Sequence, residues 1–178
     1  NNDVAKLISL GHIPSPLPGI ISEAELDLEA VSAAIKKLFE EVNPPTRDVA
    51  VALPESKIFT RVIYDLPYLS DDELAQAIRY AAEEFVPMPM KDVNLYYQVI
   101  FRSPKKEANS RTVVFVVASP KNLIDKYLKV LQNANLRVVA IETEVIASAR
   151  ALVTYNSFSP TTLIIQLGAS NTDYAVIS

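Results

Sequence analysis

Residues 58–89 read IFTRVIYDLPYLSDDELAQAIRYAAEEFVPMP, and their pattern is the clearest indication of secondary structure in the chain. Its first part alternates side chains along one extended segment that ends at Leu66-Pro67, as is typical of a strand. Ser70 and Glu73 form a capping box, because each side chain can satisfy the backbone N–H of the other residue, so a helix begins there. The segment Pro87-Met88-Pro89 ends that helix, since a proline cannot donate into the ladder. A strand followed by a helix predicts an α/β unit.

The flanking residues extend this pattern in both directions. We predict further strands at 4–10, 49–53, 93–101, 112–118, 136–141, 163–167 and 172–177. We predict further helices that start at Asp27, at Pro120 after a Ser119 N-cap, and at Glu144. Asn43-Pro44-Pro45 should stop the helix that starts at Asp27, and Asn133 to Asn135 should supply a left-handed stop for the helix that starts at Pro120. The order of elements indicates two layers of α/β structure, with a small subdomain at Ser56 to Ile141 inserted into an outer one.

Composition excludes several classes of function. The formal net charge is -4 with no cluster of basic residues, which is unlike a nucleic-acid-binding protein. The chain has no cysteine, so disulfides, thiolate zinc sites and cysteine nucleophiles are excluded. The longest apolar run is Val113–Ala118, and a membrane-spanning helix needs about 20 apolar residues. The single histidine, His12, has no identifiable catalytic partner in the sequence, which favours a structural or exposed residue.

A series of segments resembles the PilM family of type IV pilus assembly proteins. The resemblance spans essentially the whole chain in one order and is most specific in its middle. The segments that carry it are Val51–Ser56, Arg61–Pro67, Glu73-Leu74, Ala82–Pro89, Asp92-Val93, Leu95–Tyr97, Val117–Lys121, Tyr127, Leu131, Leu136, Ile141-Glu142, Ala147, Ala151 and Leu163–Gly168.

The resemblance implies an actin-like fold related to the cell-division protein FtsA. Residues 1–55 and 142–178 would then form an incomplete subdomain 1A, and residues 56–141 the inserted subdomain 1C, with its strand-helix-strand-strand order. Family members begin with an Asp-x-Gly phosphate-binding turn and continue beyond Ser178 into two further subdomains. We therefore expect this chain to be a piece of a longer protein, or else a reduced relative.

One segment resembles the second phosphate loop of that fold. The candidate cofactor-binding residues are Gly168, Ala169, Ser170, Asn171 and Thr172, whose backbone N–H groups and small side chains could surround phosphate oxygens. Actin-like folds usually carry an acidic residue where Gln166 stands, so the amide weakens the case for magnesium-dependent hydrolysis. The alternative is a simple tight turn between strands, which we favour for this chain alone.

Other segments have structural explanations beside functional ones. Asp71-Asp72-Glu73 lies in the first turn of a helix, where the dipole favours negative charge, so neither this run nor Glu83-Glu84 is taken as a catalytic or metal site. Pro87–Met90 could be an adaptable docking surface or only a turn that ends a helix. Tyr96 and Tyr97 point to opposite faces of their strand, so we expect one to be buried and the other exposed.

The resemblance implies an interaction module of the cytoplasm. PilM-like proteins receive the N-terminal cytoplasmic peptide of the inner-membrane protein PilN in a groove between subdomains 1A and 1C, whose residues the sequence does not number. We expect PilN as a partner, other platform or motor proteins and self-association as further contacts, no nucleic acid, and contact with the membrane only through PilN. ATP and magnesium are expected, if at all, in the full-length protein.

Two alternatives remain open from the sequence. One is a polymerising actin-like ATPase closer to FtsA, which would need an intact nucleotide cleft. The other is the cytoplasmic part of a type II secretion platform protein with a related fold. We assign no catalytic residue and no metal ligand to this chain, and a weak ATPase activity would belong to the full-length parent.

Overall fold

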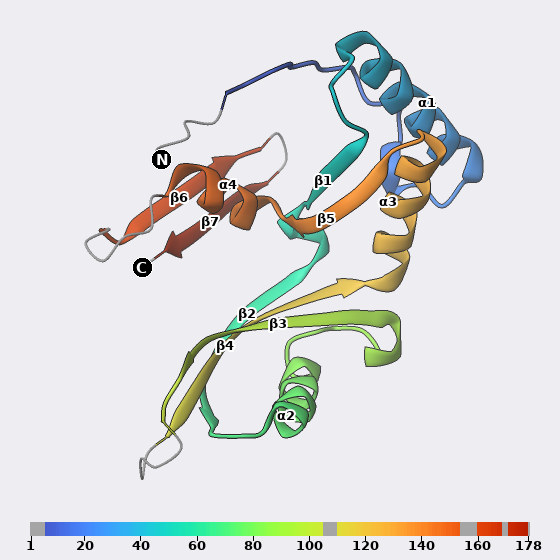
Figure 1. Cartoon of the computed structure of the whole chain (residues 1–178). Coiled ribbons are helices and arrows are strands. Elements are labelled where there is room, and N and C mark those ends of the chain that lie inside the picture. The colour runs from blue at the N-terminus through green and yellow to red at the C-terminus, as the bar shows by residue number, and fades with distance from the viewer. Residues whose placement is uncertain (1–5, 105–109, 154–159, 169–170, 178) are drawn as a thin grey trace. The chain divides into compact units, whose positions relative to one another are not determined.

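The computed structural model describes residues 6–104, 110–153, 160–168 and 171–177 (Figure 1). The chain divides into two compact units: Asn1–Val51 with Leu123–Glu142, and Ala52–Asn122 with Thr143–Ser178. These boundaries differ from the predicted ones, because residues 123–142 fall in the first unit and residues 143–178 in the second. The fold is mixed α/β, as the element order of the sequence predicts. The assignment of subdomains 1A and 1C stays a prediction.

The first unit packs two helices beside a two-stranded sheet. Its elements are η1 (Gly19–Ile21), α1 (Glu25–Val42), β1 (Asp48–Leu53), α3 (Lys121–Asn133) and β5 (Arg137–Thr143), of which β1 and β5 pair. The helices meet through the buried side chains of Leu28, Val31 and Val130. The predicted stops are confirmed, since Asn43 has φ 46° and Asn135 has φ 61°, both in the left-handed region.

Ion pairs join the surface of the first unit. Lys126 pairs with Glu23, and Lys129 lies 2.7 Å from a carboxylate oxygen of Glu25. Where β1 and β5 begin, the Arg137 guanidinium donates to both carboxylate oxygens of Asp48, at 2.5 and 2.6 Å. This hydrogen-bonded pair lowers the pKa of Asp48 and raises that of Arg137.

The predicted strand at 4–10 is not found in the part of it that the structure describes. Residues 6–10 form no strand, and the side chains of Leu7 and Ile8 are largely exposed. No described strand pairs with this segment, and an extended segment without a neighbour cannot satisfy a sheet ladder. Residues 4 and 5 lie outside the described part.

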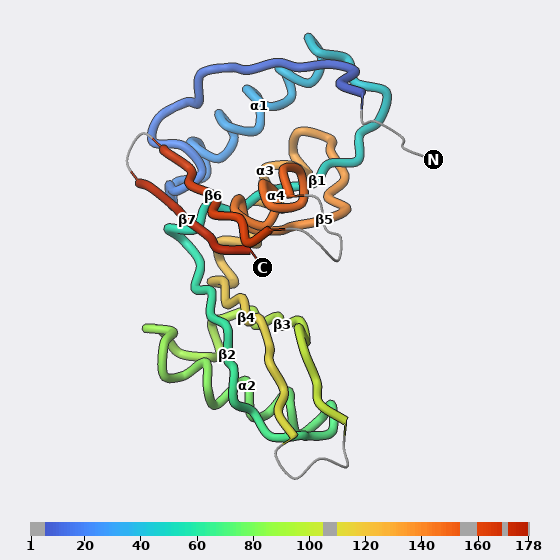
Figure 2. The backbone as a smooth tube through the Cα atoms, turned by 90° about the vertical axis from the view of Figure 1, so that its left-hand side faces the viewer, coloured from blue at the N-terminus to red at the C-terminus, as the bar shows by residue number. Residues whose placement is uncertain are grey.

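The second unit contains a three-stranded antiparallel sheet covered by one helix. Its elements are η2 (Glu55–Lys57), β2 (Phe59–Pro67), α2 (Asp71–Glu83), η3 (Met90–Asp92), β3 (Val93–Arg102) and β4 (Arg111–Pro120). The strand order is β2-β4-β3, so β4 lies in the middle (Figure 2). Along the chain, α2 follows β2 and precedes β3, so the strand and helix that residues 58–89 predict are both present.

The apolar stripe of α2 forms the core of this unit. The predicted capping box is present: Ser70 accepts from the Glu73 backbone N–H, and the Glu73 carboxylate accepts from the Ser70 backbone N–H at 2.9 Å. Leu74 and Ile78 are at most 1% exposed and pack against fully buried valines of β4, Val114 and Val116. Burying such side chains contributes about 1.5–3 kcal/mol each, so this cluster stabilises the unit.

The rest of the second unit is a helix that lies against a hairpin. α4 (Glu144–Leu152) begins at Thr143, whose hydroxyl accepts the Ile146 backbone N–H. β6 (Thr162–Leu167) and β7 (Thr172–Ile177) pair antiparallel, with Leu167 opposite Thr172, as predicted for a turn at Gly168. α4 contacts both strands.

Two predictions are wrong, one about where β4 ends and α3 begins and one about the burial of two tyrosines. Ser119 and Pro120 are the last residues of β4, not the cap and first residue of α3, because both pair with β3 opposite Asn94 and Val93. Tyr96 and Tyr97 are 62% and 39% exposed, so neither is buried. Both lie on β3, an outer strand of the sheet, where side chains on either face have fewer neighbours.

Candidate partner-binding groove

The two faces of the three-stranded sheet have different surroundings. The ladder places Arg61 opposite Val116 and Ile63 opposite Val114, so these residues share the face that α2 covers. Side chains at the intervening positions point to the other face, because the period of a strand is two. On that second face, Val62 lies opposite Phe115, and Phe115 lies opposite Gln98.

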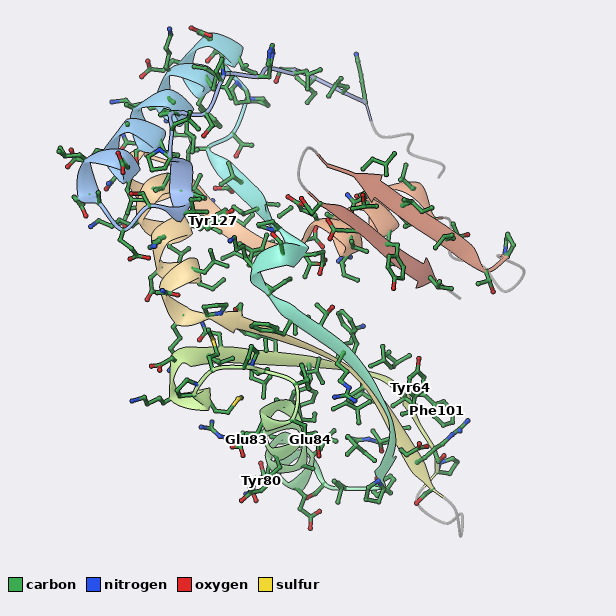
Figure 3. All side chains as sticks on the ribbon, turned by 180° about the vertical axis from the view of Figure 1, so that it is seen from behind. Tyr64, Tyr80, Glu83, Glu84, Phe101 and Tyr127 are labelled. Carbon is green, nitrogen blue, oxygen red and sulfur yellow. The ribbon has the colours of Figure 1, made fainter. Side chains whose placement is uncertain are left out.

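A bulge in β3 adds aromatic surface to the second face. Strict alternation predicts that Phe101 shares one face of β3 with Val93, Leu95, Tyr97 and Val99. For Phe101 this prediction is wrong. The register shifts between Val99 and Phe101, and Phe101 lies opposite Val113 rather than one position further along. Figure 3 shows Tyr64 and Phe101 on the side of the sheet away from α2, where they are 63% and 47% exposed. Sequence periodicity alone could not place this bulge.

A groove of about 1300 Å³ lies over this face within the second unit. From the sheet it is lined by residues that include Val62, Tyr64, Ile100, Val113 and Phe115. The opposite wall consists of side chains of α4 and all of β7, among them Val145, Ile146, Ala149, Tyr174 and Val176. Most lining side chains are aliphatic or aromatic, with Glu55, Arg61, Arg150 and Asp173 as the charged members.

The lining residues come from both sides of the predicted subdomain boundary. Residues 58–115 fall in the predicted 1C and residues 143–177 in the predicted 1A. The sequence did carry one signal for this surface. β2 has apolar residues at both odd and even positions, such as Val62 and Ile63, which indicates apolar neighbours on both faces of the strand. That signal does not reveal the opposite wall, which depends on tertiary structure.

The phosphate-loop candidates are only partly described. Ala169 and Ser170 lie outside the described residues. The Gly168 backbone N–H donates to the Asn171 carbonyl at 2.9 Å, and the Asn171 side-chain amide donates to Asp173 at 2.6 Å. Both of these donors are used within the turn, beside the Asp173 carboxylate, and the phosphate-loop role of the segment stays a prediction. Thr172 opens β7 and is exposed.

The neighbouring Gln166 has an incompletely paired amide. Its nitrogen donates to the Ser148 hydroxyl of α4 at 2.9 Å, whereas its side-chain oxygen is buried without a hydrogen-bond partner. The bond ties the hairpin to α4 and leaves no carboxylate at this position for a magnesium-bound water. We therefore derive no nucleotide chemistry through these residues, and binding of ATP stays a prediction for a longer protein.

Of the two acidic runs, Asp71-Asp72-Glu73 has structural partners. Asp71 lies in the first turn of α2 and accepts from Arg102 at 3.0 Å, while Glu73 completes the capping box. Glu83 and Glu84 lie at the exposed end of α2 (Figure 3). Among the described residues, no group of three or more histidine, cysteine, aspartate or glutamate side chains could hold a metal ion.

The structure also shows the surroundings of Pro87–Met90 and of His12. Met88 and Met90 are half-buried and pack against the cluster of Val86 and Val93, which favours the structural interpretation of Pro87–Met90 over an open docking surface. His12 is exposed. In the part of the chain that the structure describes, no helix combines the length and the apolarity that crossing a bilayer requires.

Comparison with solved structures finds similar folds, among them the following two. A chain of a "PilM-PilN type IV pilus biogenesis complex" matches with 25% identity and a TM-score of 0.78, over 95% of this chain and 50% of that one. The cytoplasmic domain of EpsL, an inner-membrane component of the type II secretion system of Vibrio cholerae, matches with 16% identity and a TM-score of 0.55. That match covers 82% of this chain and 57% of the EpsL domain, and at this identity it shows the fold alone.

The chain thus spans about half the length of the PilM-PilN structure that it matches. Its α/β fold agrees with that structure along nearly all of its own length. The sequence profile of the type IV pilus assembly protein PilM covers residues 6–178, which is almost every residue of the chain. The resemblance inferred from the sequence is therefore confirmed, and the chain belongs to the PilM family of type IV pilus assembly proteins.

Proposed function

We propose that this chain is the partner-binding part of a type IV pilus assembly protein and that its groove receives the cytoplasmic N-terminal peptide of PilN. The observation that carries the proposal is the apolar groove of the second unit. A similar chain is known in a PilM-PilN complex, which makes PilN the partner to test first.

The size of the groove supports a peptide rather than a small metabolite. Its volume of about 1300 Å³ exceeds the roughly 300–1,000 Å³ that small-molecule pockets usually have. Its apolar walls suit the burial of aliphatic side chains, and its scattered charges can orient a segment without catalysing a reaction. A peptide site needs no nucleophile, and the described residues that line the groove include neither cysteine nor histidine.

The exposed aromatic side chains on the sheet face add a second reason. Tyr64 on the sheet is 63% exposed and Tyr174 on the opposite wall is 76% exposed, and both line the groove. Large apolar side chains of this kind supply most of the binding energy at protein interfaces once a partner removes them from water. Membrane contact would then be indirect, through the partner, at the cytoplasmic side of the inner membrane.

Titration of a labelled PilN N-terminal peptide from the same genome into the folded chain tests this proposal. We expect saturable binding with one peptide per chain. The matched variants are Val62→Asp, which places a charge in the groove, and Gln76→Asp on α2, whose exposed side chain does not line the groove. Loss of affinity with Val62→Asp but not with Gln76→Asp supports the groove. Absence of saturable binding by the folded parent chain contradicts the proposal.

A further inference from the structure

We infer that the guest segment binds in the groove as an added β-strand, along the free edge of β2. This inference rests on the proposed function, because it states how the PilN segment would be held. It concerns the backbone of residues Phe59–Val62, whereas the proposed function concerns only the apolar side chains of the groove. The two can therefore fail separately.

The sheet order leaves one edge of β2 without a partner. In the order β2-β4-β3, β2 pairs on one side with β4 and, among the described strands, on the other side with none. An outer strand presents a row of backbone N–H and C=O groups that can template another strand. The ladder to β4 runs through Phe59 to Ile63 without a break, so this part of β2 is regular.

The groove runs along this edge rather than only over one face of the strand. A cavity above a sheet is lined by every second residue of a strand, because successive side chains point to opposite faces. Here Ile58, Phe59, Thr60, Arg61 and Val62 all line the groove in succession. Residues whose side chains point to either face of β2 therefore reach the cavity, which indicates that the edge of β2 is part of the cavity wall.

Both faces beside this edge offer contacts for alternating side chains. On one face, Val62 and Tyr64 adjoin Phe115 of the middle strand. On the other face, the Arg61 guanidinium lies 5.3 Å from the ring centre of Phe85, and both residues line the groove. An added strand would direct successive side chains to these two faces in turn, as in strand addition elsewhere.

Two other strands line the groove with consecutive residues, but each is a poorer template. The three from β3, Gln98 to Ile100, lie at the bulge, where the ladder is interrupted. β7 belongs to a two-stranded hairpin, and such hairpins are marginally stable alone. β2 is anchored to the buried core under α2, so its edge is preorganised and less entropy is lost when a strand pairs with it.

Residue-resolved amide hydrogen exchange of the whole chain, with and without the unmodified PilN peptide, tests this inference. In the free chain, we expect alternate amides of Phe59–Ile63 to exchange fast, because only every second N–H faces β4. At saturating peptide, we expect the fast amides to slow at least tenfold. If the fast amides of β2 stay fast while the peptide is bound, or if β7 is protected instead, the inference is overturned.

A peptide series gives an independent readout. Replacing single backbone amides of the PilN peptide by esters removes one N–H and keeps every side chain. We expect affinity losses of about three- to tenfold at every second position and little change between them, since one hydrogen bond is lost each time. Binding of the unmodified peptide with no such alternation overturns the added strand alone. Failure of the unmodified peptide to bind overturns the added strand and the proposed function together.

Discussion

The two faces of the β2-β4-β3 sheet are built from similar residues and have opposite surroundings. Under α2, Leu74, Ile78 and Val116 are at most 1% exposed. On the other face, Tyr64 lines the groove and is 63% exposed, and Phe101 is 47% exposed. The amount of apolar surface is therefore a poor guide to the role of a face. One face of this sheet has its permanent partner within the chain, and we propose that the other receives its partner from outside.

The largest expected effect comes from opening the covered face. Ile78→Ala removes a side chain that is 0% exposed and packed against the buried valines of β4. We expect the free energy of unfolding to fall by about 2–5 kcal/mol, through lost burial and a residual cavity. Urea denaturation followed by circular dichroism measures this change. A loss below about 0.5 kcal/mol would contradict the view that this face carries the stability of the unit.

On the open face, a substitution should reduce peptide affinity and leave the free energy of unfolding nearly unchanged. Tyr64→Ala truncates a side chain that is 63% exposed and lines the groove. We expect PilN peptide affinity to fall about tenfold, or roughly 1.4 kcal/mol, with stability within about 0.5 kcal/mol of the parent. Calorimetric titration and urea denaturation of the same preparation separate the two quantities.

Tyr80 provides the matched control for this change. It is 72% exposed on α2 and does not line the groove (Figure 3). Tyr80→Ala removes the same chemical group from the helix that covers the other face, so we expect peptide affinity to stay within about twofold. Equal losses of affinity in Tyr80→Ala and Tyr64→Ala would show that the difference between the faces does not determine binding.

A smaller effect is expected at the start of α2. Ser70→Ala removes the hydroxyl of the capping box but leaves the buried stripe intact. We expect a loss of about 1 kcal/mol in unfolding free energy, as is typical for an N-cap. Ser70→Asp keeps an acceptor at the N-cap and should retain most of the stability. If Ser70→Ala and Ser70→Asp are equally destabilising, the capping interaction is not the cause.

The sequence predicted the covered face well because local rules specify it. The capping box at Ser70, the spacing of Leu74 and Ile78, and the asparagine stops all act within one or two turns of chain. The pattern therefore placed the elements of this sheet and its helix, apart from the last residues of β4. The likeness to PilM rests on the order of many short segments along the chain and not on any single residue.

The open face could not be predicted in the same way. A bulge between Val99 and Phe101 moves one aromatic side chain to the other face, and nothing in strict alternation marks it. The exposure of both Tyr96 and Tyr97, which point to opposite faces, depends on β3 being an outer strand, which is a property of the sheet order. The groove also requires α4 and β7, far away in the sequence. Register and long-range contacts, rather than propensity, determine these features.

NMR mapping of the bound peptide distinguishes binding in the groove from binding to the surface of α2. The labelled chain is titrated with the PilN N-terminal peptide while backbone and methyl signals are followed. We predict the largest shifts at groove residues such as Val62, Val113 and Ile146, and small shifts at Ile78 and Tyr80 on α2. Saturable binding with shifts centred on the outer surface of α2, and with the groove signals unchanged, would show that the groove is not the binding site.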